Sequence, residues 1–263
     1  MLVLCYGIPK SGSTLAFELV KGVLESVGHR QERLPDGPVN RHRRMNFLEP
    51  VDESRVKTLI AAIGQRSIAV KTHSGMSDAL FPFLENLQAA RQVQIIASYR
   101  DPRDICLSLV DAGVKARAKG RKEFSETVDI ASAVPRVVAQ IAKFRKWASV
   151  RGALRLDYDT VAFATDTAID QIEKSLGIVS DRKRAKEHAF TDAFTQRNKA
   201  KRKRFEEELT EAQKKELTAK FAPFIRNVCE GKNDQWFLNY RQELLAKLGH
   251  RAIDVATQRE NLR

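Results

Sequence analysis

The chain has 263 residues, a length that suits one α/β domain with insertions or at most two small domains. Hydrophobic residues make up 43% of the sequence, enough for a sizeable core, and this excludes wholesale disorder. The formal net charge of +13 favours anionic partners: nucleotides, nucleic acid, acidic glycans or an anionic membrane. The three cysteines provide neither a disulfide framework nor a metal-binding spacing, which indicates buried free thiols in a reducing compartment.

No stretch of the sequence has the pattern of a targeting or membrane segment. Met1 leads directly into an apolar run without a cationic leader, and no stretch of about 18 apolar residues follows it. We therefore expect a cytoplasmic protein without a transmembrane segment.

The first two predicted elements enclose a glycine-containing turn. Residues 2–6 are rich in strand formers, and apolar residues from 15 to 27 recur at helical spacing. Between them, residues 7–14 read Gly-Ile-Pro-Lys-Ser-Gly-Ser-Thr. A turn from a strand into a helix directs free backbone N–H groups and the positive end of the helix dipole at one point. The octet therefore predicts an anion site, which phosphate or sulfate esters fit best.

The octet differs from the ATP-binding loop G-x-x-x-x-G-K-[ST] at one position. Both glycines are present, as Gly7 and Gly12, but Ser13 stands where that loop has its lysine. The lysine of this chain comes three positions earlier, at Lys10. A P-loop kinase that uses ATP and Mg²⁺ on a small molecule is therefore the alternative hypothesis rather than the first one.

Two further strand ends carry polar residues. A short buried strand over residues 68–70 is followed by Lys71 and His73. The next strand ends at Arg100, and Ser108 lies within the helix that follows. Open α/β sheets bind ligands at the carboxyl ends of their strands. We therefore expect these two strand ends and the first turn to converge at one edge of the sheet.

The remaining periodicities complete an alternation of strands and helices. Predicted strands cover residues 2–6, 68–70, 93–99 and 153–158. Predicted helices cover residues 15–27, 51–64, 78–90, 134–150, 165–176, 210–221 and 234–248, with a further helix starting at Pro102. This alternation predicts a single α/β domain over residues 1–263, with a mostly parallel central sheet, helices on both faces and a helical C-terminal part from about residue 205.

The first turn carries a resemblance to a known family. The motif Pro-Lys-Ser-Gly-Ser-Thr after a first strand resembles the 5′-phosphosulfate loop of the sulfotransferases that use 3′-phosphoadenylyl sulfate (PAPS). Lys71-Thr72-His73 is similar to a strand that ends in K-T-H in the same family. Arg100 and Ser108, eight positions apart, resemble the pair that holds the 3′-phosphate there. The resemblance covers roughly residues 2–210 and implies the P-loop-NTPase-like sulfotransferase fold.

The resemblance also implies a role for each matching residue. Lys10 would stabilise the bridging oxygen as the S–O bond breaks, Lys71 would contact the sulfuryl oxygens, and His73 would accept the proton of the acceptor. Arg100 and Ser108 would hold the 3′-phosphate, which ATP lacks. The 5′-phosphosulfate would be held by Ser11, Gly12, Ser13 and Thr14.

A basic stretch, residues 182–204, resembles another family loop less closely. Many members carry R-K-G-x-x-G-x-W, whose first residues wrap the 3′-phosphate, before a C-terminal helix. The best overlay places Asn198-Lys199-Ala200 on R-K-G, Lys203 on the second glycine and Phe205 on the tryptophan. Both glycines are therefore absent here. The resemblance assigns 3′-phosphate contacts to Lys199 and to the displaced arginine, Arg197.

Other parts of the chain depart from the family or match nothing in it. Many cytosolic members have an adenine-stacking tryptophan directly after the loop's last threonine, where this chain has Leu15. Tyr158 and Asp159 resemble a pair that is structural in the family. Residues 28–46 are either an acceptor-binding loop or a mobile surface, and residues 112–127 either cover the acceptor pocket or are mobile.

Together these features predict a sulfotransferase that moves the sulfuryl group of PAPS to a hydroxyl or amine, releasing 3′,5′-adenosine bisphosphate (PAP). The acceptor stays open among glycans, small alcohols, phenols and lipids. No metal is expected, because Lys10 and the loop supply positive charge. A basic nucleic-acid-binding protein is a second alternative, although no motif of that kind is present and we expect no nucleic acid partner. A homodimer also stays open.

Overall fold

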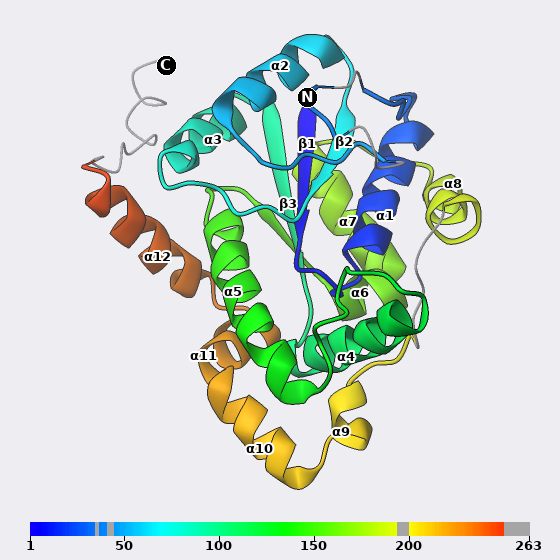
Figure 1. The fold of residues 1–263 in the computed structure, drawn as a ribbon. Helices are drawn as coiled ribbons and strands as arrows, with labels where there is room; N and C mark the ends of the chain where they lie inside the picture. Colours follow the sequence, from blue (N-terminus) through cyan, green and yellow to red (C-terminus); the bar gives the residue numbers. More distant parts are fainter. Residues whose placement is uncertain (35–36, 41–44, 194–199, 250–263) are drawn as a thin grey trace.

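The central sheet of the protein is parallel throughout (Figure 1). The computed structural model describes residues 1–34, 37–40, 45–193 and 200–249, and the statements below refer to these residues. Its four-stranded sheet has the order β2-β1-β3-β4. The strands are β1 (Leu2–Gly7), β2 (Ile68–Thr72), β3 (Val93–Tyr99) and β4 (Leu154–Asp157). The predicted strands and their parallel arrangement are thus confirmed.

The register places three strand ends side by side. Tyr6 near the end of β1 pairs with Thr72 of β2 on one side and with Ala97 of β3 on the other. Because all three strands run in the same direction, the turns that follow them leave the sheet at the same edge. The predicted convergence of these turns is therefore a property of the sheet.

Helices cover both faces of the sheet, as predicted (Figure 1). They are α1 (Ser13–Ser26), α2 (Glu53–Ile63), α3 (Leu80–Ala89), α4 (Pro102–Ala118), α5 (Ile130–Ala148), α6 (Tyr158–Phe163), α7 (Thr165–Leu176), α8 (Arg182–Glu187), α9 (Arg204–Glu208), α10 (Glu211–Lys220), α11 (Ala222–Phe224) and α12 (Asp234–Lys247). Two π-helical segments, η1 (His188–Asp192) and η2 (Ile225–Glu230), follow α8 and α11.

The alternation of side chains along β1 divides the core in two. Leu2, Leu4 and Tyr6 belong to the cluster that α2, α3 and α5 cover. Val3 and Cys5 point to the opposite face and belong to the cluster that α1 and α7 cover. Every residue of β1 is buried, which is the pattern expected of a central parallel strand. All three cysteines are free, and two of them are buried, as predicted.

The element boundaries differ from the prediction in several places. Strand β2 extends to Thr72, so Lys71 lies within the strand rather than after it. Helix α4 continues to Ala118, into the stretch where the sequence showed little pattern. The chain then folds back onto α4, and a Cβ atom on Gly113 would lie only 2.0 Å from the backbone oxygen of Thr127. Glycine at this position therefore permits the close approach of the returning segment.

A capping box formed by Asp129 and Ser132 starts α5 at Ile130, earlier than the apolar periodicity indicated. Helices occupy most of the chain from Arg204 to Lys247, as predicted for the C-terminal part. The predicted domain extends to residue 263, and its last residues, 250–263, lie outside the described residues. In the described parts of the chain, no helix combines the length and the apolar character that crossing a membrane requires.

Truncation of Leu4 tests the importance of the central strand. Leu4 is fully buried in the middle of β1, so Leu4→Ala should leave a cavity and lower the free energy of unfolding by about 2–5 kcal/mol. Urea denaturation followed by circular dichroism measures this change. Val179→Ala, at a residue that is 87% exposed, is the matched control and should change stability by less than about 0.5 kcal/mol.

Candidate active site

The turn between β1 and α1 has the shape of an anion-binding loop. Gly12 precedes α1 with a left-handed φ of 76°, and Lys10 also has a left-handed φ, 72°. The first N–H groups of a helix have no intrahelical partner, and here they face the bend. The hydroxyl oxygen of Ser11 is buried and has no hydrogen-bond partner among the described residues. A buried hydroxyl without a partner inside a helix-terminal loop is suited to an anionic ligand.

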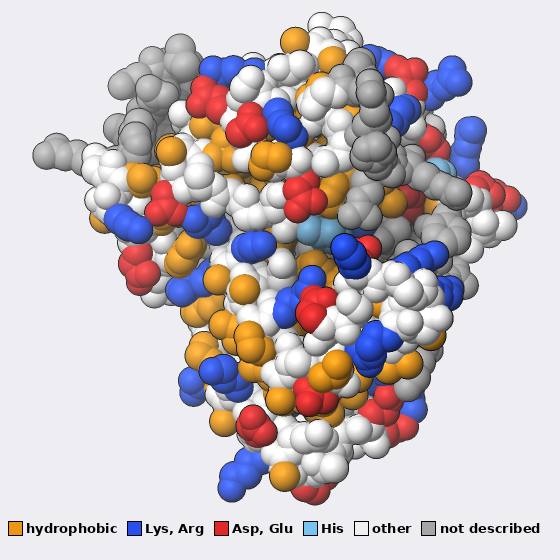
Figure 2. Space-filling view, viewed as in Figure 1, with side chains coloured by type: hydrophobic (Ala, Val, Ile, Leu, Met, Phe, Trp, Pro, Cys, Tyr) orange, Lys and Arg blue, Asp and Glu red, His pale blue; other side chains and the backbone are white. Residues whose placement is uncertain are grey.

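The side chain of Lys10 lies at the mouth of this loop. Its ammonium is 5.8 Å from the centre of the Phe124 ring, which comes from the segment folded back over α4. Burial lowers the pKa of Lys10, and the nearby charge of Lys115 lowers it further, against the opposing effects of Asp111 and Glu123. Figure 2 shows Lys and Arg side chains gathered around the middle of this face, between α5 and α1. This charge distribution favours an anion near the loop.

Lys71 connects β2 to the first turn of α1. Its side chain is buried within the strand, and its ammonium donates a hydrogen bond of 2.6 Å to the hydroxyl oxygen of Thr14. The contact joins a residue of the loop to one 57 positions later in the chain. It places a positive charge directly behind the end of the anion-binding turn.

His73, just after β2, is oriented by the end of β1. Its Nδ1 lies 2.6 Å from the backbone oxygen of Gly7, and the edge of its ring faces Phe47. A backbone carbonyl can only accept a hydrogen bond, so Nδ1 carries the hydrogen in this contact. The neutral imidazole then has its lone pair on Nε2, which is the arrangement that a general base requires.

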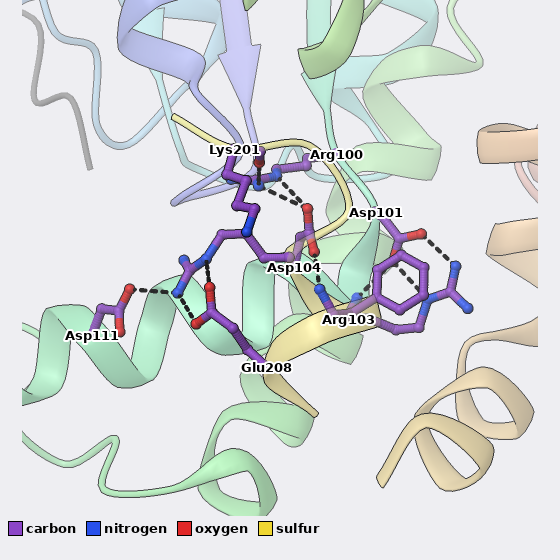
Figure 3. Close-up of polar contacts among 9 residues, drawn as sticks. Arg100, Asp101, Arg103, Asp104, Asp111, Lys201 and Glu208 are labelled. Atoms are coloured by element: carbon purple, nitrogen blue, oxygen red, sulfur yellow. Dashed lines mark hydrogen bonds and ion pairs between the residues drawn. The ribbon is translucent and has the colours of Figure 1, made fainter. Parts of the chain in front are cut away.

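Arg100, at the tip of β3, is buried and hydrogen-bonded to Asp104 and Lys201 (Figure 3). Its Nη2 and Nε donate to Oδ2 of Asp104 at 2.7 and 3.2 Å, and Nη2 also donates to the backbone oxygen of Lys201 at 2.9 Å. Among the described residues, its Nη1 has no hydrogen-bond partner. Ser108, the other half of the predicted pair, is buried two turns into α4.

Asp104 also fixes the first turn of α9. Its Oδ1 accepts a hydrogen bond of 2.9 Å from the backbone N–H of Phe205. Arg204 is buried between Asp111 and Glu208, with ion-pair distances of 2.9 and 2.7 Å (Figure 3). Asp104 and Asp111 of α4 therefore hold the start of α9 in place by charge-assisted contacts.

The stretch just before α9 has two residues in the left-handed backbone conformation that usually favours glycine, although neither is a glycine. Ala200 and Lys203, which the overlay aligns with the two glycines of R-K-G-x-x-G-x-W, have left-handed φ values of 47° and 44°. This is the conformation that glycine adopts without steric cost. Lys199 and Arg197, the predicted 3′-phosphate contacts, lie outside the described residues.

Tyr158, at the start of α6, links the two groups of residues. A Cβ atom on Gly12 would lie 2.5 Å from the Tyr158 ring, so the ring packs directly on the loop. The guanidinium carbon of Arg100 is 4.1 Å from the centre of the same ring. The structure thus brings the first loop, Lys71, His73 and Arg100 to one edge of the sheet.

A pocket of about 380 Å³ is lined in part by Arg100. Its lining combines Arg103 and Lys203 with several carboxylates, among them Asp157 and Asp159. Because carboxylates outnumber cations in its lining, this pocket is a poor site for a phosphate. In this respect it differs from the basic surface near Lys10.

Sequence reasoning missed Phe124 and Asp104 and gave Tyr158 only a structural role. Phe124 and Tyr158 reach the loop through long-range packing, which leaves no pattern in the sequence. Asp104 forms an ion pair with Arg100 four positions earlier, but Arg100 precedes helix α4, so helical spacing did not predict the pair.

Comparison with known proteins agrees with this geometry. No model of a protein family matches the chain, and no curated protein matches it. Retinol dehydratase, solved with androsterone and the inactive cofactor PAP, matches with a TM-score of 0.52 and 14% identity over 85% of this chain and 80% of that one. Mouse sulfotransferase SULT7A1, solved with PAP, matches with a TM-score of 0.50 and 15% identity over 91% of this chain and 88% of that one. The chain therefore has the α/β fold of the sulfotransferases.

A pH dependence of stability follows from the carboxylates beside Arg100. Burial, and then the charge of Asp159, raise the pKa of Asp157 from 3.8 to about 6. The carboxyl group of Asp157 therefore binds a proton more tightly in the folded chain than in the unfolded chain. Its protonated form contributes fully to the stability of the fold below pH 3.8, and this contribution is lost as the pH rises to about 6. Asp157→Asn removes the buried charge and should raise stability by about 1–2 kcal/mol at pH 7.5 but little at pH 4.

Thermal unfolding of Asp157→Asn and of the unmodified chain between pH 4 and pH 7.5 measures this difference in stability. Asp166→Asn, at a surface carboxylate paired with Lys186, is the control and should show no such gain at pH 7.5. A stability difference between Asp157→Asn and the unmodified chain that is the same at both pH values would contradict the assignment.

Proposed function

We propose that the chain is a sulfotransferase that moves the sulfuryl group of PAPS to a hydroxyl or amine group of an acceptor. The observation that carries this proposal is the meeting of three strand ends around one anion-binding loop: the loop itself, the Lys71–His73 segment and Arg100. The two matched structures with PAP support the choice of nucleotide.

The loop residues suit the 5′-phosphosulfate. Ser11, Gly12, Ser13 and Thr14 offer backbone N–H groups at the start of α1, and the buried hydroxyl of Ser11 needs a partner. Lys10 would face the oxygen between phosphorus and sulfur, where negative charge grows as the S–O bond breaks. Lys71, behind Thr14, would contact the sulfuryl oxygens or hold the Thr14 hydroxyl in place for them.

His73 suits the role of the base. In the transfer, an acceptor oxygen or nitrogen attacks the sulfur atom, the S–O bond to the phosphate breaks, and the acceptor loses a proton. Donation from Nδ1 to Gly7 leaves Nε2 to take up that proton. PAP and the sulfated acceptor are the products.

The second group of residues suits the 3′-phosphate. Asp104 and Lys201 engage Nε and Nη2 of Arg100, and the N–H groups of Nη1 remain to contact a phosphate oxygen. Ser108 would add its hydroxyl, and the resemblance adds Lys199 and Arg197, which lie outside the described residues. Recognition of this phosphate would distinguish PAPS from ATP, which lacks it.

The alternatives are weaker but testable. A small-molecule kinase would use a lysine at position 13, where the chain has Ser13. A nucleic-acid-binding protein would show binding that falls steeply with salt. No group of three or more potential metal ligands occurs among the described residues, and a transfer reaction without a metal stays a prediction, as do a cytoplasmic location and a homodimer.

Calorimetric titration with PAP and AMP tests the nucleotide. The unmodified chain should bind PAP at least about ten-fold more tightly than AMP, because a charge-assisted phosphate contact contributes about 1.5–3 kcal/mol. Arg100→Ala should remove most of this preference. Comparable weak affinity of the unmodified chain for both nucleotides would sink the proposal.

Substitution at the two strand ends tests the chemistry. Lys10→Ala and His73→Ala should each lower sulfuryl transfer from labelled PAPS, screened against glycans, phenols, alcohols and amines, by about 10²–10⁴-fold. Lys57→Ala on α2 and His29→Ala after the far end of α1 are matched controls and should keep full activity. Full activity of His73→Ala would show that another group takes the proton.

A further inference from the structure

The position of Tyr158 shows where a bound nucleoside has to lie. Its ring contacts both Gly12 of the first loop and Arg100. These are the residues proposed for the 5′ and the 3′ side of the nucleotide. A nucleoside that bridges the two would therefore lie close to Tyr158, the first residue of helix α6. In Figure 1, α6 lies beside the start of α1, as their contacts require.

The far end of α6 carries an unusual side chain for a surface. Phe163 is 39% exposed and is the aromatic member of the large exposed hydrophobic residues in the described part of the chain. Its ring meets that of Tyr158 edge to face at a centroid distance of 5.8 Å. Next to the proposed nucleoside path, the chain thus has a partly exposed aromatic ring.

A cation from the segment before α9 lies over the same ring. The guanidinium carbon of Arg202 is 4.6 Å from the centre of the Phe163 ring. Arg202 is exposed, and its charge interacts with the nearby carboxylate of Asp159. A phenyl ring and a planar guanidinium are the two kinds of side-chain surface on which a purine base stacks.

Other candidate surfaces near the loop are less suitable. Leu15, which follows the loop, is partly buried against the core below α1 and offers no ring. Phe205 is buried, and Arg103 covers it at 3.6 Å. The pocket beside Arg100 is lined largely by carboxylates, which offer no flat apolar face.

We propose that Phe163 and Arg202 bind the adenine ring of the nucleotide between them, in place of an aromatic residue at position 15. The inference rests on the proposed function, because it takes the nucleotide to be PAPS. The base stacks on the phenyl ring, and the guanidinium of Arg202 moves outward to cover its other face. Arg202 lies on the segment that also holds Arg100 through Lys201, so the base and the 3′-phosphate are bound by the same stretch of chain.

Calorimetric titration with PAP and with cytidine 3′,5′-bisphosphate tests this surface. The two ligands carry the same phosphates, but the pyrimidine offers a smaller stacking area. Phe163→Ala should weaken PAP binding about ten-fold and weaken the cytidine ligand less, so the preference for the purine shrinks. Arg202→Gln should have a smaller effect in the same direction. Leu238→Ala, at a residue with a similar exposed fraction of 46%, is the matched control and should change neither affinity.

The outcomes separate the two proposals. If the unmodified chain binds PAP no better than AMP, both the proposed function and the adenine surface are overturned. If the unmodified chain binds PAP and Phe163→Ala binds it equally well, or loses both bisphosphates in equal measure, only the adenine surface is overturned. Phe163→Leu keeps the apolar volume without the ring and should reproduce the loss of purine preference, which excludes a general disturbance of α6.

Discussion

The parallel pairing of β1 with both β2 and β3 is the constraint on which the rest of the structure depends. Since β1 is buried on both faces, its register with the neighbouring strands is fixed by two separate cores at once. That register sets where the three following turns emerge. The contact of His73 with Gly7 and that of Lys71 with Thr14 are both consequences of it. The candidate site is thus assembled by backbone pairing, and side chains then refine it.

How far the sequence could predict this molecule depends on the range of each interaction. Local signals were sufficient for the strands, for most helices and for the turn at Gly12, because periodicity and glycine placement are read over a few residues. Contacts between residues far apart in the sequence could not be predicted from such local signals. The packing of Tyr158 on Gly12 and that of Phe124 near Lys10 join segments more than a hundred residues apart. The extension of α4 was missed because its last turns are polar and are stabilised by the returning segment near Thr127.

The turn before α9 shows how charge and conformation support each other. A residue other than glycine in the left-handed region costs roughly 1–2 kcal/mol, and Ala200 and Lys203 both adopt it. Buried ion pairs of Arg204 and the double role of Asp104 hold the segment in place against that cost. A buried charge that lost its partner would be strongly unfavourable, so these contacts are expected to form together or not at all.

The backbone at Ala200 and Lys203 has a consequence for the way such proteins are found. A search pattern that demands glycine at these two places passes over this chain, although the bend that glycine ordinarily supplies is present. The likeness in fold at this bend is visible in the backbone torsion angles and not in the residue types. A comparison of backbone geometry at this bend, with any residue allowed there that its neighbours can hold in place, would therefore find further chains of the same fold.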